Sequence, residues 1–287
     1  MASQDGAAAP RVALYDRVFK PQVTTLPNGK SVSKPRSRAP FAIAFIVVMT
    51  VVSVQVTGFD MTKLVTRIGQ FFVILQQMFF EPSPSWDYMS QVWEPLFATI
   101  QMSLLGSFIG GVVAIPFAML AASNVVRSRV VVGLVRLFLS VVRTVPTLVS
   151  ALIATYVFGL GTLAGTTAIA IFTFAYVGKL LYENIETADM GPFEAMLAMG
   201  STRIRAFMGA IVPQVMPIYL SNCMFCFEGN VRYAAILGYV GAGGLGLILN
   251  ENLGWREYAN VGMVLVALFV TVFIIENTSR AIRRHLS

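Results

Sequence analysis

Charged residues are scarce in this sequence. Asp, Glu, Lys and Arg make up 12% of its 287 residues and 56% are hydrophobic, whereas a soluble domain usually carries about 25% charged residues. A fold in water has too little interior to hide so much apolar surface, so a soluble globular protein is excluded. The composition predicts an all-α integral membrane protein.

Histidine and cysteine are also rare, which argues against an enzyme. The single histidine, His285, lies near the C-terminus, and no paired carboxylates, metal-ligand cluster or nucleophile–base set stands out. Cys223 and Cys226 form a CxxC without a second pair, so we expect two small residues in a buried helix rather than a zinc or redox site. The sequence therefore predicts no catalytic residues, no metal site and no cofactor bound by this chain.

Two glycine-containing motifs resemble nucleotide-binding sequences but lack the context that such sites need. Gly241–Gly246 matches GxGxxG, yet its surroundings do not fit a strand–helix unit, so we expect close backbone packing near the membrane surface instead. Gly29-Lys30-Ser31 lacks the upstream glycine of a phosphate-binding loop. The chain thus shows no ATPase of its own.

Long charge-free runs dominate the sequence. A helix needs about 20 apolar residues to cross the hydrocarbon core of a bilayer. Six spans are predicted, roughly at 41–59, 96–121, 137–158, 163–182, 211–236 and 258–279. The chain is accordingly divided into a polar basic tail (1–39), a first transmembrane helix (40–59), an external segment (60–94), a core of five helices (95–280) and a short cytoplasmic tail (281–287).

The basic residues indicate how these spans are oriented. With the N-terminus inside, the cytoplasmic segments are 1–39, 123–143, 179–209 and 280–287. They hold every Lys and Arg except Lys63, Arg67, Arg232 and Arg256. This asymmetry follows the positive-inside rule and predicts that both termini are cytoplasmic. Basic residues that flank apolar spans also favour contact with lipid over a nucleic-acid partner.

The external segment contains a predicted amphipathic helix. Between Met61 and Phe79, apolar residues follow the i, i+3, i+4 spacing of one helix face and polar residues fill the other. Asp60 is expected to cap its start, and Pro82 and Pro84 to end it. Such a helix either lies in the plane of the membrane interface or packs on the spans, and both alternatives stay open.

The most informative stretch, residues 189–217, lies between the fourth and fifth spans. Helix-forming residues run from Glu194 to Met199, Gly200 can end that helix, and Ser201 can cap the next one. Two short helices at a bend would make a knob that projects from the membrane. An ordinary loop is compatible with the same residues.

Part of this stretch resembles a known family motif. Glu194-Ala195, Gly200 and Pro213 resemble the EAA loop of binding-protein-dependent ABC importer permeases, which reads Glu-Ala-Ala, three residues, Gly, nine residues and Ile-x-Leu-Pro. The chain departs from that pattern at Met196, Ala210 and Val212. The resemblance implies that residues 190–206 dock on a separate ATPase subunit. The coupling residues that it implies are Glu194, Ala195, Gly200, Ser201, Arg203 and Pro213.

Further segments extend the likeness to the five-helix MetI-like permease core. Gly238–Gly246 is similar to methionine- and phosphonate-type permeases, and Arg143–Pro146 and Tyr182–Glu186 are most similar to the phosphonate branch. The resemblance implies a permease subunit in the bacterial cytoplasmic membrane that carries phosphonate or a related phosphorus oxyanion. The partners that it implies are a second copy of the chain, two ATP-binding subunits that hold ATP and Mg²⁺, and an external substrate-binding protein.

Other transport functions stay open from the sequence. Within the importer class, the solute can be phosphite, a phosphate ester or methionine, because the binding protein carries much of the affinity. An ion-coupled secondary transporter needs no ATPase, but such proteins often show two interrupted helices in corresponding positions. The sequence shows one interrupted region, around 237–255.

Four charged residues are candidates for the transport pathway. Glu228 and Arg232 lie four residues apart in what we expect to be the external half of the fifth span. Either Arg232 attracts or gates an anionic substrate, or the pair only satisfies itself. Arg136 and Arg143 share a face of the third span, where they either anchor its cytoplasmic end or receive the anion as it leaves.

Overall fold

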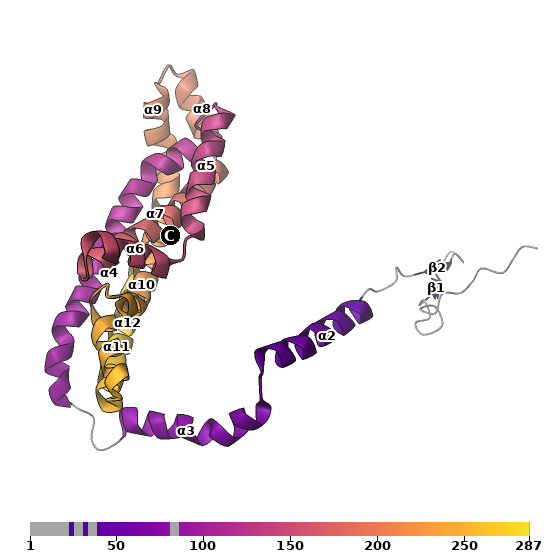
Figure 1. Cartoon of the computed structure of the whole chain (residues 1–287). Helices are drawn as coiled ribbons and strands as arrows, with labels where there is room; N and C mark the ends of the chain where they lie inside the picture. The colour runs from indigo at the N-terminus through magenta and orange to yellow at the C-terminus, as the bar shows by residue number, and fades with distance from the viewer. Residues whose placement is uncertain (1–22, 26–30, 34–38, 81–85, 287) are drawn as a thin grey trace, which may run out of the picture. The chain divides into compact units, whose positions relative to one another are not determined.

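The computed structural model describes residues 23–25, 31–33, 39–80 and 86–286 (Figure 1). Most of the predicted basic tail, including Gly29 and Lys30, and the predicted helix-ending Pro82 and Pro84 lie outside these residues. The chain divides into two units, residues 1–69 and 70–287, which are described separately.

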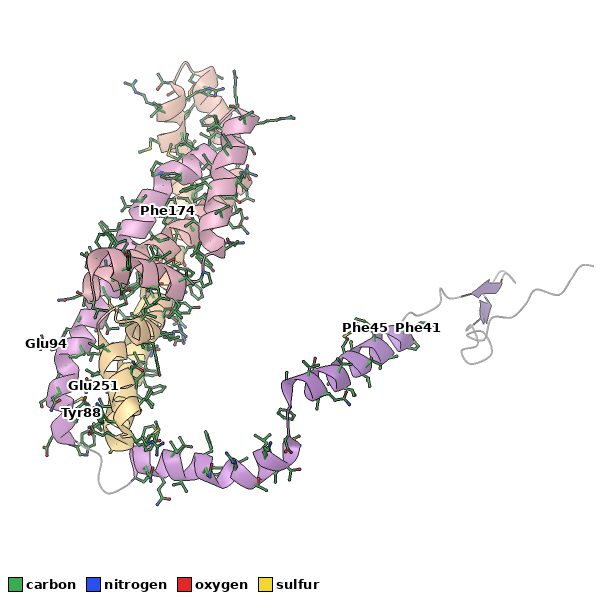
Figure 2. The ribbon with its side chains drawn as sticks, in the orientation of Figure 1. Phe41, Phe45, Tyr88, Glu94, Phe174 and Glu251 are labelled. Carbon is green, nitrogen blue, oxygen red and sulfur yellow. The ribbon has the colours of Figure 1, made fainter. Side chains whose placement is uncertain are left out.

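The first unit contains a short β-ladder and a fully exposed helix. Strands β1 (Val23–Thr25) and β2 (Ser31–Ser33) pair antiparallel, with Thr24 opposite Val32, which the all-α prediction did not include. Helix α2 (Ala39–Thr57) covers the predicted first span. None of its side chains is buried, and Phe41 and Phe45 project outward from it (Figure 2). An apolar helix of this length fits a lipid-facing span.

Helix α3 (Met61–Phe79) begins in the first unit and ends in the second. Its predicted cap is confirmed, since Asp60 Oδ1 accepts hydrogen bonds from the backbone N–H groups of Thr62 at 2.9 Å and Lys63 at 3.3 Å. None of its side chains is buried. Both predicted placements of this helix, in the plane of the membrane interface and against the spans, stay predictions.

The second unit is an elongated helical bundle (Figure 1). Its elements are η1 (Trp86–Tyr88), α4 (Met89–Ala121), α5 (Arg129–Thr144), α6 (Thr147–Phe158), α7 (Thr162–Thr187), α8 (Gly191–Ala198), α9 (Arg203–Ala206), the π-helix η2 (Phe207–Ile211), α10 (Val212–Leu237), η3 (Gly238–Val240), α11 (Leu245–Trp255) and α12 (Tyr258–Leu286). Helices α8 and α9 lie at one end of the bundle. Tyr88, Glu94 and Glu251 lie toward the opposite end (Figure 2).

Helices α4 and α7 form the most extensive contact in the bundle. Two glycines on α4 permit it: a Cβ atom at Gly106 would lie 2.7 Å from Ile169 Cγ2, and one at Gly110 would lie 2.5 Å from the carbonyl oxygen of Ala170. Inside a membrane the hydrophobic effect does not drive helices together. Their association depends instead on close packing, which small residues allow. Helices α10, α5 and α6 then pack on this pair.

The predicted third span, 137–158, is not one continuous helix. Helices α5 and α6, which together are long and apolar enough to span a membrane, meet at an angle of 87° around Val145 and Pro146. Proline lacks the backbone N–H that would continue the helix, and it forces the preceding residue out of the helical region; Val145 is extended, with ψ 120°. Among the described residues, five other helical segments are long and apolar enough to span a membrane: Ala39–Thr57, Trp86–Ala121, Thr162–Thr187, Arg203–Val240 and Tyr258–Arg284.

The glycine-rich segment after α10 packs closely, as expected. A Cβ atom on Gly238 would lie 2.0 Å from the carbonyl carbon of Gly246, so both positions need the absence of a side chain. The backbone N–H of Leu245 donates to Thr99 Oγ1 of α4 at 2.8 Å, which fixes the start of α11. The interruption predicted at 237–255 is therefore present. The break at Val145–Pro146 is a second interruption, so the expectation of one interrupted region is wrong.

Candidate functional site

The predicted knob is present as α8 and α9. Gly191 donates its backbone N–H to Asp189 Oδ1 at 2.9 Å as α8 begins. Helix α8 ends where predicted, because Gly200 has a φ of 86°, which a residue without a Cβ adopts readily. Gly200 N–H donates to Leu197 O at 2.9 Å and Ser201 N–H to Met196 O at 3.1 Å. These two bonds form a Schellman motif and turn the chain sharply.

The predicted cap of the second short helix is one residue off. Thr202, not Ser201, is extended and accepts a hydrogen bond on Oγ1 from the backbone N–H of Arg205 at 3.4 Å. The physical reason is that the Schellman turn includes Ser201 as its last donor. Helix α9 therefore starts one residue later.

The knob presents most of its predicted coupling residues to solvent. Glu194 and Ala195 on α8, Gly200 in the turn and Arg203 on α9 are exposed, and Ser201 is partly buried. Pro213 is also exposed, but it lies in the first turn of α10 and outside the knob. Sequence reasoning missed two apolar side chains here: Met199 is 79% exposed and Ile204 is 78% exposed. Both side chains lie among exposed charged residues of the knob.

The root of the knob is buried and tied to α10. Phe193 is buried in a cluster that includes Leu181 and Phe207. The Gln214 side chain closes the base: its Oε1 accepts from Asp189 N–H at 3.0 Å, and its Nε2 donates to Asp189 O at 3.1 Å and to Ala210 O at 2.7 Å. Sequence reasoning missed Gln214, although it is a polar residue in an otherwise apolar run.

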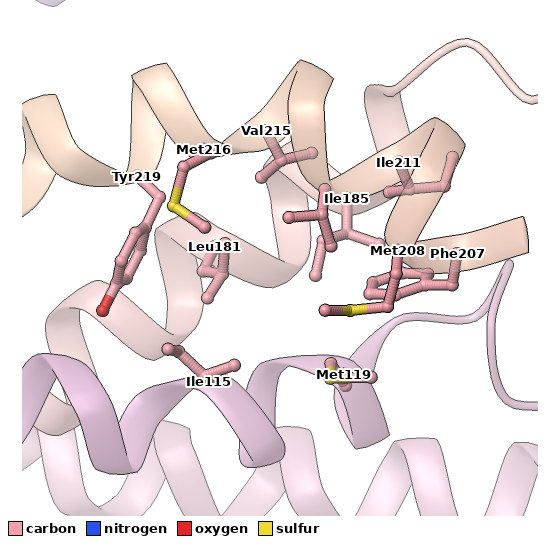
Figure 3. A pocket seen from close by; sticks show the side chains of 11 residues that line it. Ile115, Met119, Leu181, Ile185, Phe207, Met208, Ile211, Val215, Met216 and Tyr219 are labelled. Atoms are coloured by element: carbon pink, nitrogen blue, oxygen red, sulfur yellow. The ribbon is translucent and has the colours of Figure 1, made fainter. Parts of the chain in front are cut away.

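An apolar cavity of about 220 Å³ lies directly beneath this root (Figure 3). The π-helix η2 contributes Phe207, Met208 and Ile211 to its wall. The other walls come from α4, α7 and α10, and Tyr219 lies at one end (Figure 3). A π-turn is wider than an α-turn and often marks a functional position. The knob is therefore joined to the bundle by a π-turn, and this turn borders the cavity.

Arg136 is fully engaged in holding helices together. Its Nη2 forms an ion pair with Glu186 on α7, its Nε donates to Ala121 O at 2.9 Å, and its guanidinium lies 4.8 Å from the Tyr182 ring centre. Ser123 N–H also donates to Glu186 at 2.8 Å. These contacts join the ends of α4 and α7 to the middle of α5 below the knob and fit an anchoring role.

Arg143 occupies a different environment from Arg136. It is exposed in the last turn of α5, directly before the bend at Val145–Pro146. The structure therefore does not bring the two arginines into one site.

Glu228 is the most deeply buried carboxylate of the predicted site. It is 5% exposed on α10 and forms the expected ion pair with Arg232. Its second oxygen, Oε2, lies 3.6 Å from Nη2 of Arg283 on α12. Sequence reasoning missed Arg283, because only the packing of α10 on α12 brings it to Glu228.

Arg283 belongs to the C-terminal turns of α12, where the pair of Glu276 and Arg280 follows the apolar run. Glu228 and Arg232 lie in the C-terminal half of α10, and their place in the external half of the span stays a prediction.

A buried amide lies next to this pair. Asn230 is 1% exposed, and its Nδ2 donates to Ser107 Oγ on α4 and to Thr173 Oγ1 on α7, both at 2.8 Å. One of these hydrogen bonds joins α10 to α4 and the other joins it to α7. The amide thus fixes the position of α10 against α4 and α7 close to Glu228.

Comparison with known sequences bears on both the knob and the Glu228 pair. The profile of a family described as the binding-protein-dependent transport system inner membrane component matches residues 114–282, which include the knob, Glu228 and Arg232. The chain is 35% identical over 188 residues to the phosphate-import permease protein PhnE of Mycolicibacterium smegmatis, covering 66% of this chain and 35% of that relative. It is 33% identical over 191 residues to the phosphite transport system permease protein PtxC of Stutzerimonas stutzeri, covering 67% of this chain and 70% of that relative.

Comparison with solved structures bears on the fold. The chain superposes on a chain of the MetNI methionine ABC transporter, solved in inward-facing conformations, with a TM-score of 0.63. The sequence identity is 22%, and the superposition covers 71% of this chain and 99% of the other. The predicted all-α, MetI-like membrane fold is therefore confirmed.

Proposed function

The chain belongs to the family of binding-protein-dependent transport system inner membrane components, and on this premise we propose that it is the permease subunit of an ATP-driven importer for phosphonate or a related phosphorus oxyanion. The observation that carries the proposal is the exposed two-helix knob, whose root is tied to α10. The names of the relatives support a phosphorus oxyanion over methionine.

The importer would be assembled from several chains. Two copies of this multi-pass membrane protein pair in the bacterial cytoplasmic membrane, with both termini inside. Two ATP-binding subunits hold ATP and Mg²⁺ and receive the knobs, and an external binding protein delivers the solute. ATP hydrolysis thus belongs to the partner subunits. The charged and apolar side chains together on the knob surface support docking of this kind.

Movement would pass from the knob into the bundle through the root. Closure of the ATP-binding pair displaces both knobs, and Gln214 and Phe193 transmit that displacement to the start of α10. Arg136 and Glu186 hold the middle of α5 to the end of α7 below. The cavity beside η2 provides room for the root to shift without new overlaps. The pathway along α10 then alternates between inward- and outward-facing forms.

Co-purification tests the docking role directly. We compare tagged wild-type protein with Gly200→Asp and with a matched control, Gly58→Asp. Both glycines have positive φ, 86° and 62°, and neither has atoms within 4 Å of an added Cβ, so the two substitutions impose similar backbone strain. We expect wild type and Gly58→Asp to bring down an ATP-binding subunit with ATPase activity, and Gly200→Asp to lose the subunit or its activity.

The opposite result favours an ion-coupled transporter. If none of the three proteins carries an ATPase, the importer proposal fails, and the two interruptions near Pro146 and in 237–255 become the place to search for a coupling-ion site. If Gly58→Asp and Gly200→Asp lose the ATPase equally, the knob is not the dock.

A further inference from the structure

A cavity of about 370 Å³ lies between α7 and α10 beside Arg232. Its wall combines that guanidinium with Tyr176 and Tyr233, and Gly229 leaves part of the wall open. Phe172 lies between the two tyrosines, with ring centres 5.8 Å from each. A guanidinium with phenolic hydroxyl groups in an aromatic setting suits a phosphoryl oxyanion.

The charge of this region is positive. Glu228 contacts Arg232 through one oxygen and Arg283 through the other, so one carboxylate faces two guanidinium groups. Among the described residues that line the cavity, none is acidic. A site for a zwitterion such as an amino acid would need an anionic partner for the ammonium group, which this lining does not offer. The balance favours an anion.

The two arginines of Glu228 differ in their freedom to move. The Arg232 side chain is 53% exposed, whereas the Arg283 side chain is 26% exposed and its guanidinium lies 5.9 Å from the Phe225 ring centre. Leaving a buried carboxylate without any partner is costly. Since Arg283 stays at the second oxygen, Arg232 can leave the first one while Glu228 keeps a counter-charge.

We propose that Arg232 binds the transported phosphorus oxyanion and that Glu228 competes with the anion for it. The anion displaces Glu228 from Arg232 when it enters the cavity, and Glu228 takes Arg232 back when the anion leaves. Tyr176 and Tyr233 donate hydrogen bonds to the anion. This inference rests on the proposed function, since it assigns residues to the same transport pathway.

The test uses the complete importer, with its ATP-binding subunits and binding protein, reconstituted in liposomes. The probe is methylphosphonate, and uptake is measured for Arg232→Gln and for a matched control, Arg280→Gln. Both arginines are 53% exposed and pair with a Glu four residues before them on their helix. We expect Arg232→Gln to lower uptake at least tenfold, Arg232→Lys to retain part of it, and Arg280→Gln to stay near wild type.

The competitor role has its own readout. Glu228→Gln removes the competing charge, so the anion is held more tightly: we expect a lower half-saturating concentration together with a lower maximal rate, whereas Glu276→Gln changes neither. If the pair only neutralises itself, the double variant Glu228→Gln with Arg232→Gln recovers the uptake that each single variant loses. We expect no recovery, and recovery would overturn the proposal.

Further arms keep the outcomes distinct. Tyr176→Phe and Tyr233→Phe remove only a hydroxyl group, so their weaker uptake is expected even if Glu228→Gln fails to fold. Vesicles of phosphatidylcholine with and without phosphatidylglycerol separate a transported anion from a lipid headgroup. An Arg232→Gln defect seen only with phosphatidylglycerol overturns the inference.

ATPase co-purification is measured on each sample. Normal uptake by Arg232→Gln with the ATPase present refutes this inference alone, and loss of the ATPase from wild type refutes the proposed function.

Discussion

The knob, whose α9 shares the helical segment Arg203–Val240 with Glu228, is held in place by other means than the Glu228 pair. The knob depends on short-range contacts: Gly200 and Ser201 close α8, and Gln214 reaches Asp189 across 25 residues. The polar residues farther along α10 depend on distant helices, since Asn230 bonds to Ser107 across 123 residues. Local geometry thus fixes the knob, whereas helix packing creates the polar site.

This difference separates two kinds of defect. Changes in the knob should impair its coupling to the ATP-binding subunits and leave the bundle intact. Changes around Glu228 and Asn230 should alter transport or bundle stability while the knob still docks.

Phe193→Ala should give the largest effect, because it empties the buried root of the knob. Truncating a buried Phe costs about 3 kcal/mol or more. We expect faster amide hydrogen exchange throughout 189–206 and loss of substrate-stimulated ATPase activity in the assembled importer. Phe158→Ala is the control, since Phe158 is 52% exposed at the end of α6. Unchanged exchange in 189–206 would show that Phe193 does not fix the knob.

Gln214→Ala should uncouple the knob from α10 without unfolding either. The change removes three hydrogen bonds at the base, and we expect a cost of about 1–2 kcal/mol. The ratio of ATP hydrolysed to solute transported should rise, as measured in liposomes. Gln91→Ala, an exposed amide on α4, serves as control. If Gln214→Ala and Gln91→Ala gave the same ratio, Gln214 would not be the residue that transmits the movement.

Asn230→Ala should weaken the bundle rather than the knob. It deletes two interhelical hydrogen bonds, which are worth about 0.6 kcal/mol each in membranes. We expect a lower unfolding temperature in detergent, with ATPase co-purification retained. Asn222→Ala tests a partly exposed amide on the same helix and should have little effect. Loss of ATPase docking in Asn230→Ala would contradict the separation of the two regions.

Thr202→Ala should give the smallest effect and sharpens the assignment of the helix cap. The cap hydrogen bond is long at 3.4 Å, so we expect about 0.5 kcal/mol, seen as faster exchange at Arg205. Ser201→Ala is the matched comparison, because Ser201 contributes its backbone N–H and that group survives the change. Equal effects of the two substitutions would restore Ser201 as a cap.

The same division between local geometry and helix packing explains which sequence-based predictions succeeded. Charge-free runs located the long helices, and the glycine at position 200 located the end of α8, because both depend on residues close in the chain. Hydropathy did not reveal the bend at Pro146, since α5 and α6 are apolar on both sides of it. The contact of Glu228 with Arg283 depends on how α12 packs on α10, which composition does not encode.

The π-helix η2 also has a geometric consequence for the direction in which the knob points. A π-turn contains one more residue than the α-turn it replaces, whereas one residue added to a regular α-helix would rotate everything before it by about 100°. The wider turn of η2 absorbs its extra residue, so α8 and α9 keep the side of the α10 axis that a regular turn would give them. The root of the knob thus carries an additional residue without a change in the direction in which the knob points.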